Sequence, residues 1–238
     1  TQDVPGAPDQ VDLVVNVTEK PTGSLQLGAG FSSAEKVALS FGIKQENFFG
    51  SGNYLGIDVN TSKYRRTLVF STTNPYFTQD GISRTVDLYY RTDKPYEDQG
   101  GNYELVTTGA SMRFGIPFSE TDTVFFGGGF EQTQIKAGTN IPATYLAYAN
   151  TYGATSNSIP LTVGWSRDDR DSALAPNSGR YQRLNSEWSV AGDARYVRGN
   201  YQYQQYIPLN KRFTVAFNGE LGYGKGLNGR PFPVFKNF

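Results

Sequence analysis

Apolar and polar residues alternate along most of the chain, in runs separated by turn-forming residues. In residues 23–31, Leu25, Leu27, Ala29 and Phe31 fall on one face, and small or polar residues fall on the other. A period of two places successive side chains on opposite faces of a strand. The same period recurs in 36–44, 54–60, 84–91, 108–116, 159–166 and 213–223, and more weakly in 64–73, 123–135, 181–191 and 195–207. The pattern predicts eleven strands and an all-β fold, and we expect no helix of useful length.

The connections between these runs fall into two groups. Short connections rich in Gly, Pro or Asn cover 47–52, 74–81, 117–122 and 208–212, and longer polar ones cover 93–102 and 137–157. Short turns at one end and longer loops at the other are typical of outer-membrane β-barrels. A soluble β-sandwich is the alternative architecture. Charged residues in mid-strand favour the barrel, because its wet interior accepts them: Asp58, Asp87, Arg113 and Glu220.

In a barrel, the apolar face of each strand contacts lipid. The mean hydropathy of −0.49 is compatible with this arrangement, because the outer and inner faces cancel in the average. The chain contains no run of about 18 apolar residues, so the sequence predicts no transmembrane helix. We expect the lipid-facing side chains to include Leu25, Leu27, Leu39, Phe41, Leu161, Val163 and Phe217.

Composition argues against several functional classes. The formal net charge is zero, whereas a nucleic-acid-binding protein needs a basic surplus to neutralise phosphates. The chain contains no His and no Cys, which excludes a Ser-His-Asp triad, a histidine metal site and thiol catalysis. We therefore expect no enzyme activity, no cofactor, no metal and no nucleic-acid partner.

The most informative segment covers residues 159–180, where an alternating run leads directly into a charged cluster and a turn. Three aspartates lie in this cluster, but their spacing is not that of a calcium-binding loop. We expect a structural turn held by ion pairs and hydrogen bonds, with calcium binding as the alternative. The residues that define this signature turn are Arg167, Asp168, Asp169, Arg170, Asp171, Pro176 and Gly179.

Several segments, in order, resemble the BamA family of outer-membrane assembly factors. They are 20–31, 45–52, 73–77, the signature at 159–180, and 222–226 with 231–238, which is similar to the approach to the family's long sixth extracellular loop. The resemblance covers essentially the whole chain. It implies a transmembrane antiparallel β-barrel of about sixteen strands. Residues 21–238 would hold about the first eleven of these strands, so that the barrel is incomplete.

The first twenty residues differ from the rest. Apolar and polar residues alternate in 11–17, and Pro21 follows shortly after. Because the residue before a proline is disfavoured in helical geometry, we expect a strand followed by a hinge here. By the same resemblance, residues 1–20 would be the C-terminal end of the last POTRA domain, a single strand followed by a hinge. The family's Val/Ile-Arg-Gly-Phe motif would be expected soon after Phe238.

The resemblance implies that the protein inserts and folds other β-barrel proteins in the bacterial outer membrane, without nucleotide or cofactor. The expected partners are outer-membrane lipid, unfolded outer-membrane proteins and, through POTRA domains, the Bam lipoproteins. A translocation pore for two-partner secretion or autotransporter assembly is the alternative within the same superfamily. A passive porin and a soluble β-sandwich binding module are further alternatives. The number of POTRA repeats would discriminate between an assembly factor and a secretion translocator.

The first barrel strand carries the expected functional element. In the family, this strand meets the last one at a weak seam that can open sideways. An opened edge offers backbone N–H and C=O groups to which a substrate strand can add. The alternative is an ordinary wall strand, paired on both sides. The resemblance assigns the pairing role to Gly23, Ser24, Leu25, Gln26, Leu27, Gly28, Ala29 and Gly30.

Overall fold

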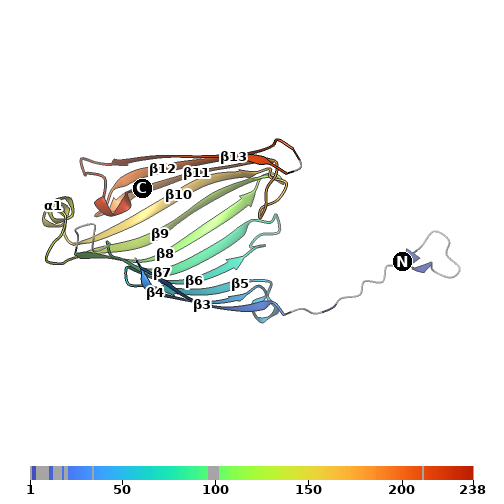
Figure 1. Ribbon diagram of the computed structural model, residues 1–238, viewed down its shortest axis with the longest axis horizontal. Coiled ribbons are helices and arrows are strands. Elements are labelled where there is room, and N and C mark those ends of the chain that lie inside the picture. Colours follow the sequence, from blue (N-terminus) through green and yellow to red (C-terminus); the bar gives the residue numbers. More distant parts are fainter. Residues whose placement is uncertain are drawn as a thin grey trace.

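Residues 2–3, 11–12, 18, 21–33, 35–95, 102–210 and 212–237 are described by a computed structural model. Its main element is an 11-stranded antiparallel sheet in which every strand pairs with its neighbours in the sequence (Figure 1). The predicted all-β fold with eleven strands is confirmed. The strands are β3 (Gly23–Ser32), β4 (Lys36–Gln45), β5 (Tyr54–Thr61), β6 (Arg65–Asn74), β7 (Ser83–Asp93), β8 (Tyr103–Pro117), β9 (Asp122–Ala137), β10 (Thr155–Asp168), β11 (Gly179–Gly192), β12 (Tyr196–Pro208) and β13 (Thr214–Gly226).

The described N-terminal residues form a second, two-stranded sheet. Strands β1 (Gln2–Asp3) and β2 (Val11–Asp12) form a two-stranded antiparallel pair. Most of the alternating stretch 11–17 and of the hinge lies outside the described residues. The assignment of residues 1–20 to a POTRA domain therefore stays a prediction. Among the described residues, no helix is both long enough and apolar enough to cross a membrane.

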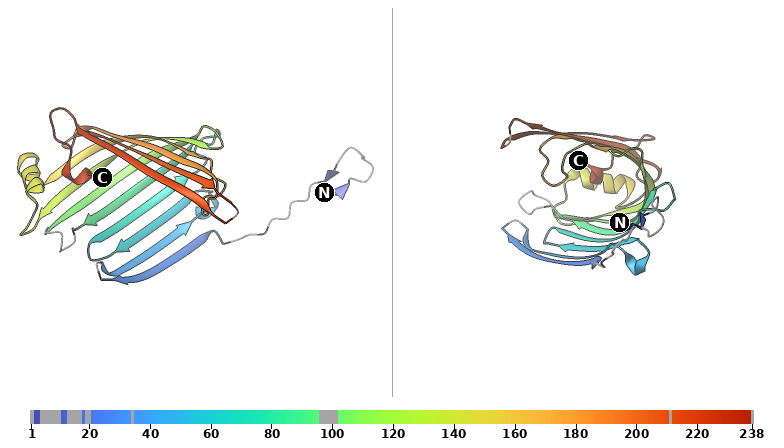
Figure 2. Two further views of the ribbon diagram at one scale, coloured as in Figure 1. Left: turned by 45° about the horizontal axis from the view of Figure 1, so that its top comes forward. Right: turned by 90° about the vertical axis from the view of Figure 1, so that its right-hand side faces the viewer.

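The large sheet is strongly curved, like a trough (Figure 2). Within the described residues, β3 and β13 form its two edges and do not pair with each other. The convex face carries exposed apolar side chains, such as Leu27 at 76% exposure and Val163 at 55%. Exposed apolar side chains along one face of a sheet suit contact with lipid. All seven residues predicted to face lipid are exposed: Leu25, Leu27, Leu39, Phe41, Leu161, Val163 and Phe217.

The concave face, which we call the lumenal face, carries polar residues. Most of the few buried side chains, including Glu131, Ser158 and Tyr196, lie towards one end of the trough. At that end, the short 3-10 turn η3 (Val234–Lys236) lies within the curve of the sheet, and the helix α1 (Ala143–Tyr152) lies at its mouth, beyond the ends of the strands (Figures 1 and 2). The buried part of the fold is therefore formed by the sheet together with these two short elements.

The helix α1 was not expected, and the prediction of no helix is wrong at this point. The segment is only 10 residues long, and apolar and polar residues do not separate onto two faces of the helix. Tertiary contacts explain its stability: the Tyr148 ring is buried and packs edge-on against Phe235, with centroids 5.6 Å apart. The Tyr145 hydroxyl donates to the Val234 carbonyl at 3.2 Å. Packing against a distant segment can form a short helix that periodicity does not predict.

The four predicted short connections, 47–52, 74–81, 117–122 and 208–212, lie at the end opposite α1, where they follow β4, β6, β8 and β12. The first contains the 3-10 turn η1 (Phe48–Gly50). The expected separation into short turns at one end and longer loops at the other is not clean, because the three-residue connections after β3, β5 and β11 lie at the α1 end. The turn after β8 is closed by the Phe118 N–H, which donates to the Asp122 carbonyl at 2.9 Å. The predicted loop 93–102 falls partly outside the described residues. The predicted loop 137–157 corresponds to the connection between β9 and β10, which ends earlier than expected because β10 begins at Thr155. This connection contains α1.

Candidate functional site: the edge strand, the signature turn and the lumenal wall

Strand β3 brings together the eight residues assigned to strand pairing. Its ten residues are all exposed, and within the described sheet β3 pairs with β4 alone. The register runs from Gly23 opposite Gln45 to Ser32 opposite Lys36. The sequence-predicted residues therefore occupy one edge of the sheet in a continuous row.

The ladder between β3 and β4 determines which backbone groups point to the open edge. The Glu46 N–H donates to the Thr22 carbonyl at 2.9 Å, so these two residues form a hydrogen-bonded pair. In an antiparallel ladder, such pairs alternate with pairs whose backbone groups point away from each other. The even-numbered residues of β3 consequently bond to β4. The outward-pointing N–H and C=O groups belong to Gly23, Leu25, Leu27, Ala29 and Phe31.

Gly28 lies opposite Ser40 in β4. A Cβ atom at position 28 would require the Ser40 hydroxyl to rotate away. On the convex face, the apolar side chains of Leu25 and Leu27 are 63% and 76% exposed. Within the described sheet, β3 thus combines outward-pointing backbone groups with an apolar outer surface, which are the two features that an added amphipathic strand requires.

The second candidate site is the signature turn, which connects β10 to β11. The Arg170 guanidinium donates to both carboxylate oxygens of Asp168, with Nε–Oδ1 at 2.8 Å and Nη2–Oδ2 at 2.7 Å. The same guanidinium lies 4.9 Å from the centroid of the Tyr181 ring. A two-point contact to a carboxylate is both stronger and more directional than a single hydrogen bond. It fixes the chain where β10 ends and β11 begins.

The other two aspartates of the turn bond to the returning chain. Asp169 accepts the Arg180 backbone N–H at 2.6 Å and the Arg180 Nε at 2.9 Å. Arg167 adds an ion pair to Asp169, with Nε–Oδ2 at 3.7 Å. Gly179 has a φ of +98°, and a Cβ atom there would collide with the Asp169 carbonyl oxygen. The close approach of these two chain segments requires glycine at this position.

Asp171 organises the tip of the turn. Its Oδ1 accepts the backbone N–H groups of Asn177 at 2.9 Å and Ser178 at 3.2 Å. These hydrogen bonds hold the pKa of the Asp171 carboxyl below its usual value. Pro176 lies in the same loop, next to Asn177. Among the described residues, no cluster of acidic side chains is arranged to hold a metal ion. These contacts support the structural interpretation of the signature turn.

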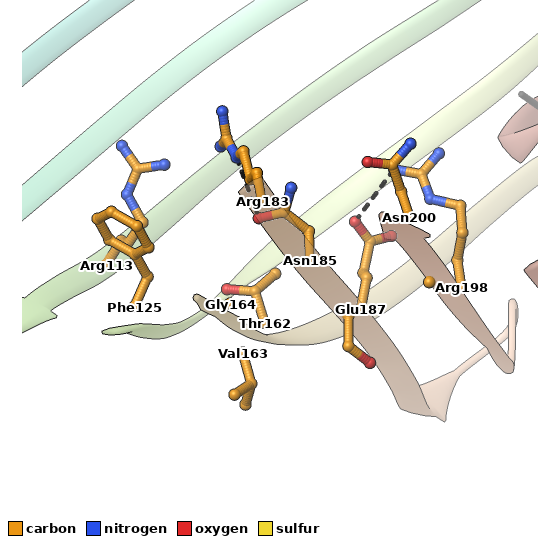
Figure 3. A pocket seen from close by; sticks show the side chains of 12 residues that line it. Arg113, Phe125, Thr162, Val163, Gly164, Arg183, Asn185, Glu187, Arg198 and Asn200 are labelled. Carbon is orange, nitrogen blue, oxygen red and sulfur yellow. Dashed lines mark hydrogen bonds and ion pairs between the residues drawn. The ribbon is translucent and has the colours of Figure 1, made fainter. Parts of the chain in front are cut away.

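The lumenal wall contains a cavity of about 350 Å³ between β8 and β12. Figure 3 shows the guanidinium groups of Arg113, Arg183 and Arg198 around it, with Asn185 and Asn200 between them. Arg198 pairs with Glu187, with Nη2–Oε2 at 3.5 Å. The sequence identified only Arg113 among these charges. The others lie on the inward face of the two weakly alternating runs 181–191 and 195–207, where mostly polar residues at every second position, among them Arg183, Glu187 and Arg198, were the available signal.

Comparisons with known proteins agree with this architecture. The model of the Omp85 superfamily domain matches residues 47–238. The outer membrane protein assembly factor BamA of Neisseria meningitidis serogroup B is 33% identical over 245 residues, which cover 98% of this chain and 31% of the relative. The factor of the same name from Nitratidesulfovibrio vulgaris is 28% identical, over 97% of this chain and 28% of the relative. The chain thus spans less than a third of the length of these two relatives.

A solved structure supports the fold independently. The crystal structure of BamA from Haemophilus ducreyi lacking POTRA domains 1–3 superposes with a TM-score of 0.80 at 24% sequence identity. The match covers 92% of this chain and 44% of that one. The described sheet therefore corresponds to part of a larger barrel. These BamA relatives share a location, the bacterial outer membrane. The superfamily match over most of the chain and the similarity to these relatives show that the chain belongs to the Omp85 superfamily.

Proposed function

We propose that this chain forms part of the barrel of an assembly factor that inserts β-barrel proteins into the bacterial outer membrane. The observation that carries the proposal is the similarity over almost the whole chain to two relatives that are both named outer membrane protein assembly factor. The place of β3 as the first strand of the large sheet, with backbone groups that point away from β4, supports its pairing role. Unfolded outer-membrane proteins are the proposed substrates, and outer-membrane lipid is the proposed surrounding.

The proposed mechanism follows from backbone chemistry in lipid. An unsatisfied peptide group in hydrocarbon costs several kcal/mol, so an exposed strand edge is under strong pressure to pair. In the whole protein, a weakly paired seam between β3 and the last strand would exchange its hydrogen bonds for those of an incoming strand. Because the number of bonds changes little, the exchange needs no nucleotide. The role of β3 in this exchange is non-catalytic, since no covalent bond forms or breaks.

The proposal also assigns the two ends of the sheet. The turns after β4, β6, β8, β10 and β12, which include the signature turn, would face the periplasm, and α1 would face the cell exterior. Bam lipoproteins would bind through POTRA domains on the N-terminal side. Asp168 and Arg170 would then act at the periplasmic rim as a structural clamp.

A disulfide lock in the full-length protein tests the seam. One cysteine replaces Gln26 or Gly28, and its partner is placed on the last barrel strand. With the lock formed, the assembly of a model barrel protein into liposomes should stop, and reduction should restore it. Full activity with the lock verifiably formed would reject lateral opening.

The matched control is a second disulfide that does not cross the seam. Gly28 and Ser40 are opposite each other in β3 and β4, so cysteines at both positions tie β3 to its permanent neighbour. This variant should keep its assembly activity under oxidising conditions. A loss of activity in both oxidised variants would mean that β3 must move away from β4, which the proposed exchange does not require.

A further inference from the structure

The segment after β13 turns back across the lumenal face instead of leaving the sheet. The Leu227 N–H donates to the Arg195 carbonyl at 2.9 Å, and Arg230 Nη1 donates to the Asp193 carbonyl at 2.6 Å. The Phe232 ring then packs edge-on against Tyr196, with centroids 5.8 Å apart, and Pro233 is fully buried. Residues 227–237, which we call the return segment, therefore lie inside the curve of the sheet beside α1 (Figures 1 and 2).

One cation near the end of the return segment joins two strands of the wall. The Lys236 ammonium lies 2.7 Å from Glu131 Oε1 on β9 and 3.3 Å from Glu187 Oε1 on β11. The side chains of Lys236, Glu131 and Glu187 are only 12%, 9% and 19% exposed. Strand β10 separates the two glutamates, so Lys236 bridges a width of three strands.

The rest of the network holds both carboxylates in place. Tyr89 donates its hydroxyl to Glu131 at 3.0 Å, and Tyr196 donates its hydroxyl to Glu187. Arg198 pairs with Glu187 and also donates to the Lys236 carbonyl at 3.3 Å. Two cations, Lys236 and Arg198, thus face two carboxylates, Glu131 and Glu187. Each of the four charges lies on the lumenal side of the wall.

The low exposure of these groups makes Lys236 energetically important to the return segment. Removing one partner of a buried ion pair leaves the other charge uncompensated, and this destabilises the arrangement more than the pair itself stabilises it. Lys236 forms the ion pair with Glu131 at 2.7 Å, and Arg198 forms an ion pair with Glu187 at 3.5 Å. Loss of the Lys236 charge would therefore leave one excess negative charge on a wall that the return segment must cover.

We propose that Lys236 is a positioning residue that latches the return segment and α1 over one end of the lumen. With the latch closed, this end of the barrel interior is blocked to ions. With the latch broken, the return segment leaves the wall and the interior opens. The inference concerns the lumen alone and does not depend on the pairing role of β3, so the two can fail separately.

The test uses the full-length protein in lipid. A spin label on a cysteine that replaces the exposed Asn237 reports the motion of the return segment, and planar-bilayer recordings report ion flow through the lumen. Lys236→Met removes the charge while keeping a long apolar side chain. We expect a clearly more mobile label and on the order of tenfold more open time, which corresponds to about 1.4 kcal/mol. An immobile label with unchanged open time, in Lys236→Met protein that inserts normally, would overturn the proposal.

Three further variants separate the latch from general damage. Lys236→Arg keeps the positive charge and should behave like the unmodified protein. Lys225→Met makes the same chemical change at an exposed lysine of β13 and should also have no effect. If Lys236 acts through Glu131, the effects of Lys236→Met and Glu131→Gln on label mobility should not add up in the double variant.

A variant with Glu131→Gln and Glu187→Gln provides a second route if Lys236→Met fails to insert. It leaves Lys236 without either carboxylate and should release the label in the same way. An immobile label and a closed lumen in this variant would reject the latch. Assembly activity measured in parallel keeps the outcome distinct from the seam experiment.

Discussion

Arg170 contacts the carboxylate of Asp168 at two points, although the two residues are only two positions apart in the chain. The Arg170 side chain is 16% exposed and that of Asp168 is 40% exposed. The guanidinium also lies over Tyr181, at the start of the next strand. The contact therefore fixes both the end of β10 and the beginning of β11, and it identifies Asp168 as a residue whose loss should weaken the barrel.

Asp168→Ala should lower the thermal stability of the barrel without creating or removing any dependence on metal ions. Because Asp168 is partly exposed, we expect a loss of about 1 kcal/mol. The measurement is the thermal midpoint by circular dichroism, in calcium and in chelator. A calcium-dependent midpoint in the unmodified protein that vanishes in Asp168→Ala would show that the turn binds metal instead.

The turn should also loosen in acid through Asp171. Its pKa is lowered in the folded state by the N–H groups of Asn177 and Ser178. A lowered folded-state pKa gives stability that is present above the unfolded value of about 3.9 and is lost as pH falls through the folded value. Amide exchange at Asn177 and Ser178 should therefore accelerate below about pH 4.

Asp171→Asn supplies the comparison for this pH effect. The variant cannot titrate, so its amide exchange should lack the additional acceleration in acid after correction for intrinsic rates. Asp80→Asn, in the turn after β6, controls for the loss of one negative charge elsewhere. Identical acid profiles for the unmodified protein and Asp171→Asn would contradict the assignment.

The two faces of β10 should respond differently to a charge. Leu161 is an exposed apolar residue of the outer face, whereas Thr162 lines the lumenal cavity. Arginine on the lipid face costs about 2–4 kcal/mol near the bilayer midplane, whereas a lumenal position stays in contact with water. Leu161→Arg should impair folding into liposomes, as measured by gel mobility without heating, and Thr162→Arg should have a milder effect. Equal tolerance at both positions would argue against contact of the convex face with lipid.

The backbone groups of β3 can be tested one residue at a time. Leu27 points its N–H to the open edge, so Leu27→Pro removes an edge donor without removing a bond to β4. Assembly of a model substrate should fall severalfold, while the barrel itself still folds. Leu27→Ala shortens the side chain but keeps the N–H, and its activity should stay near that of the unmodified protein. If both variants assemble substrate equally well, the Leu27 N–H takes no part in strand pairing.

Gly28→Pro extends this test to the adjacent position. Gly28 directs its N–H to β4, so proline there should break the ladder within the wall and lower the yield of folded barrel. The contrast between positions 27 and 28 therefore distinguishes an open edge from a general requirement for β3.

The strands could be predicted from the sequence because their determinants are local. Alternation such as Leu25, Leu27 and Ala29 sets which side chains share a face, and Gly, Pro and Asn mark where each strand must turn. Since every strand of the large sheet pairs with its neighbour in the sequence, the order of strands needs no long-range information. The same local rule identified the outward-facing Leu161 and the signature turn containing Asp168 and Arg170.

Which segments fill the lumen was decided by tertiary structure alone. Lys236 meets Glu131 and Glu187 across 105 and 49 positions of sequence, and no periodicity connects residues so far apart. The helix α1 likewise depends on contacts with Val234 and Phe235, which follow it in the sequence only after strands β10 to β13. A strand carries the information for its own two faces, but what fills the space enclosed by the sheet depends on how the curved wall brings distant segments together. For that reason the sequence determined the wall of this protein, and only the folded chain determined what lies inside it.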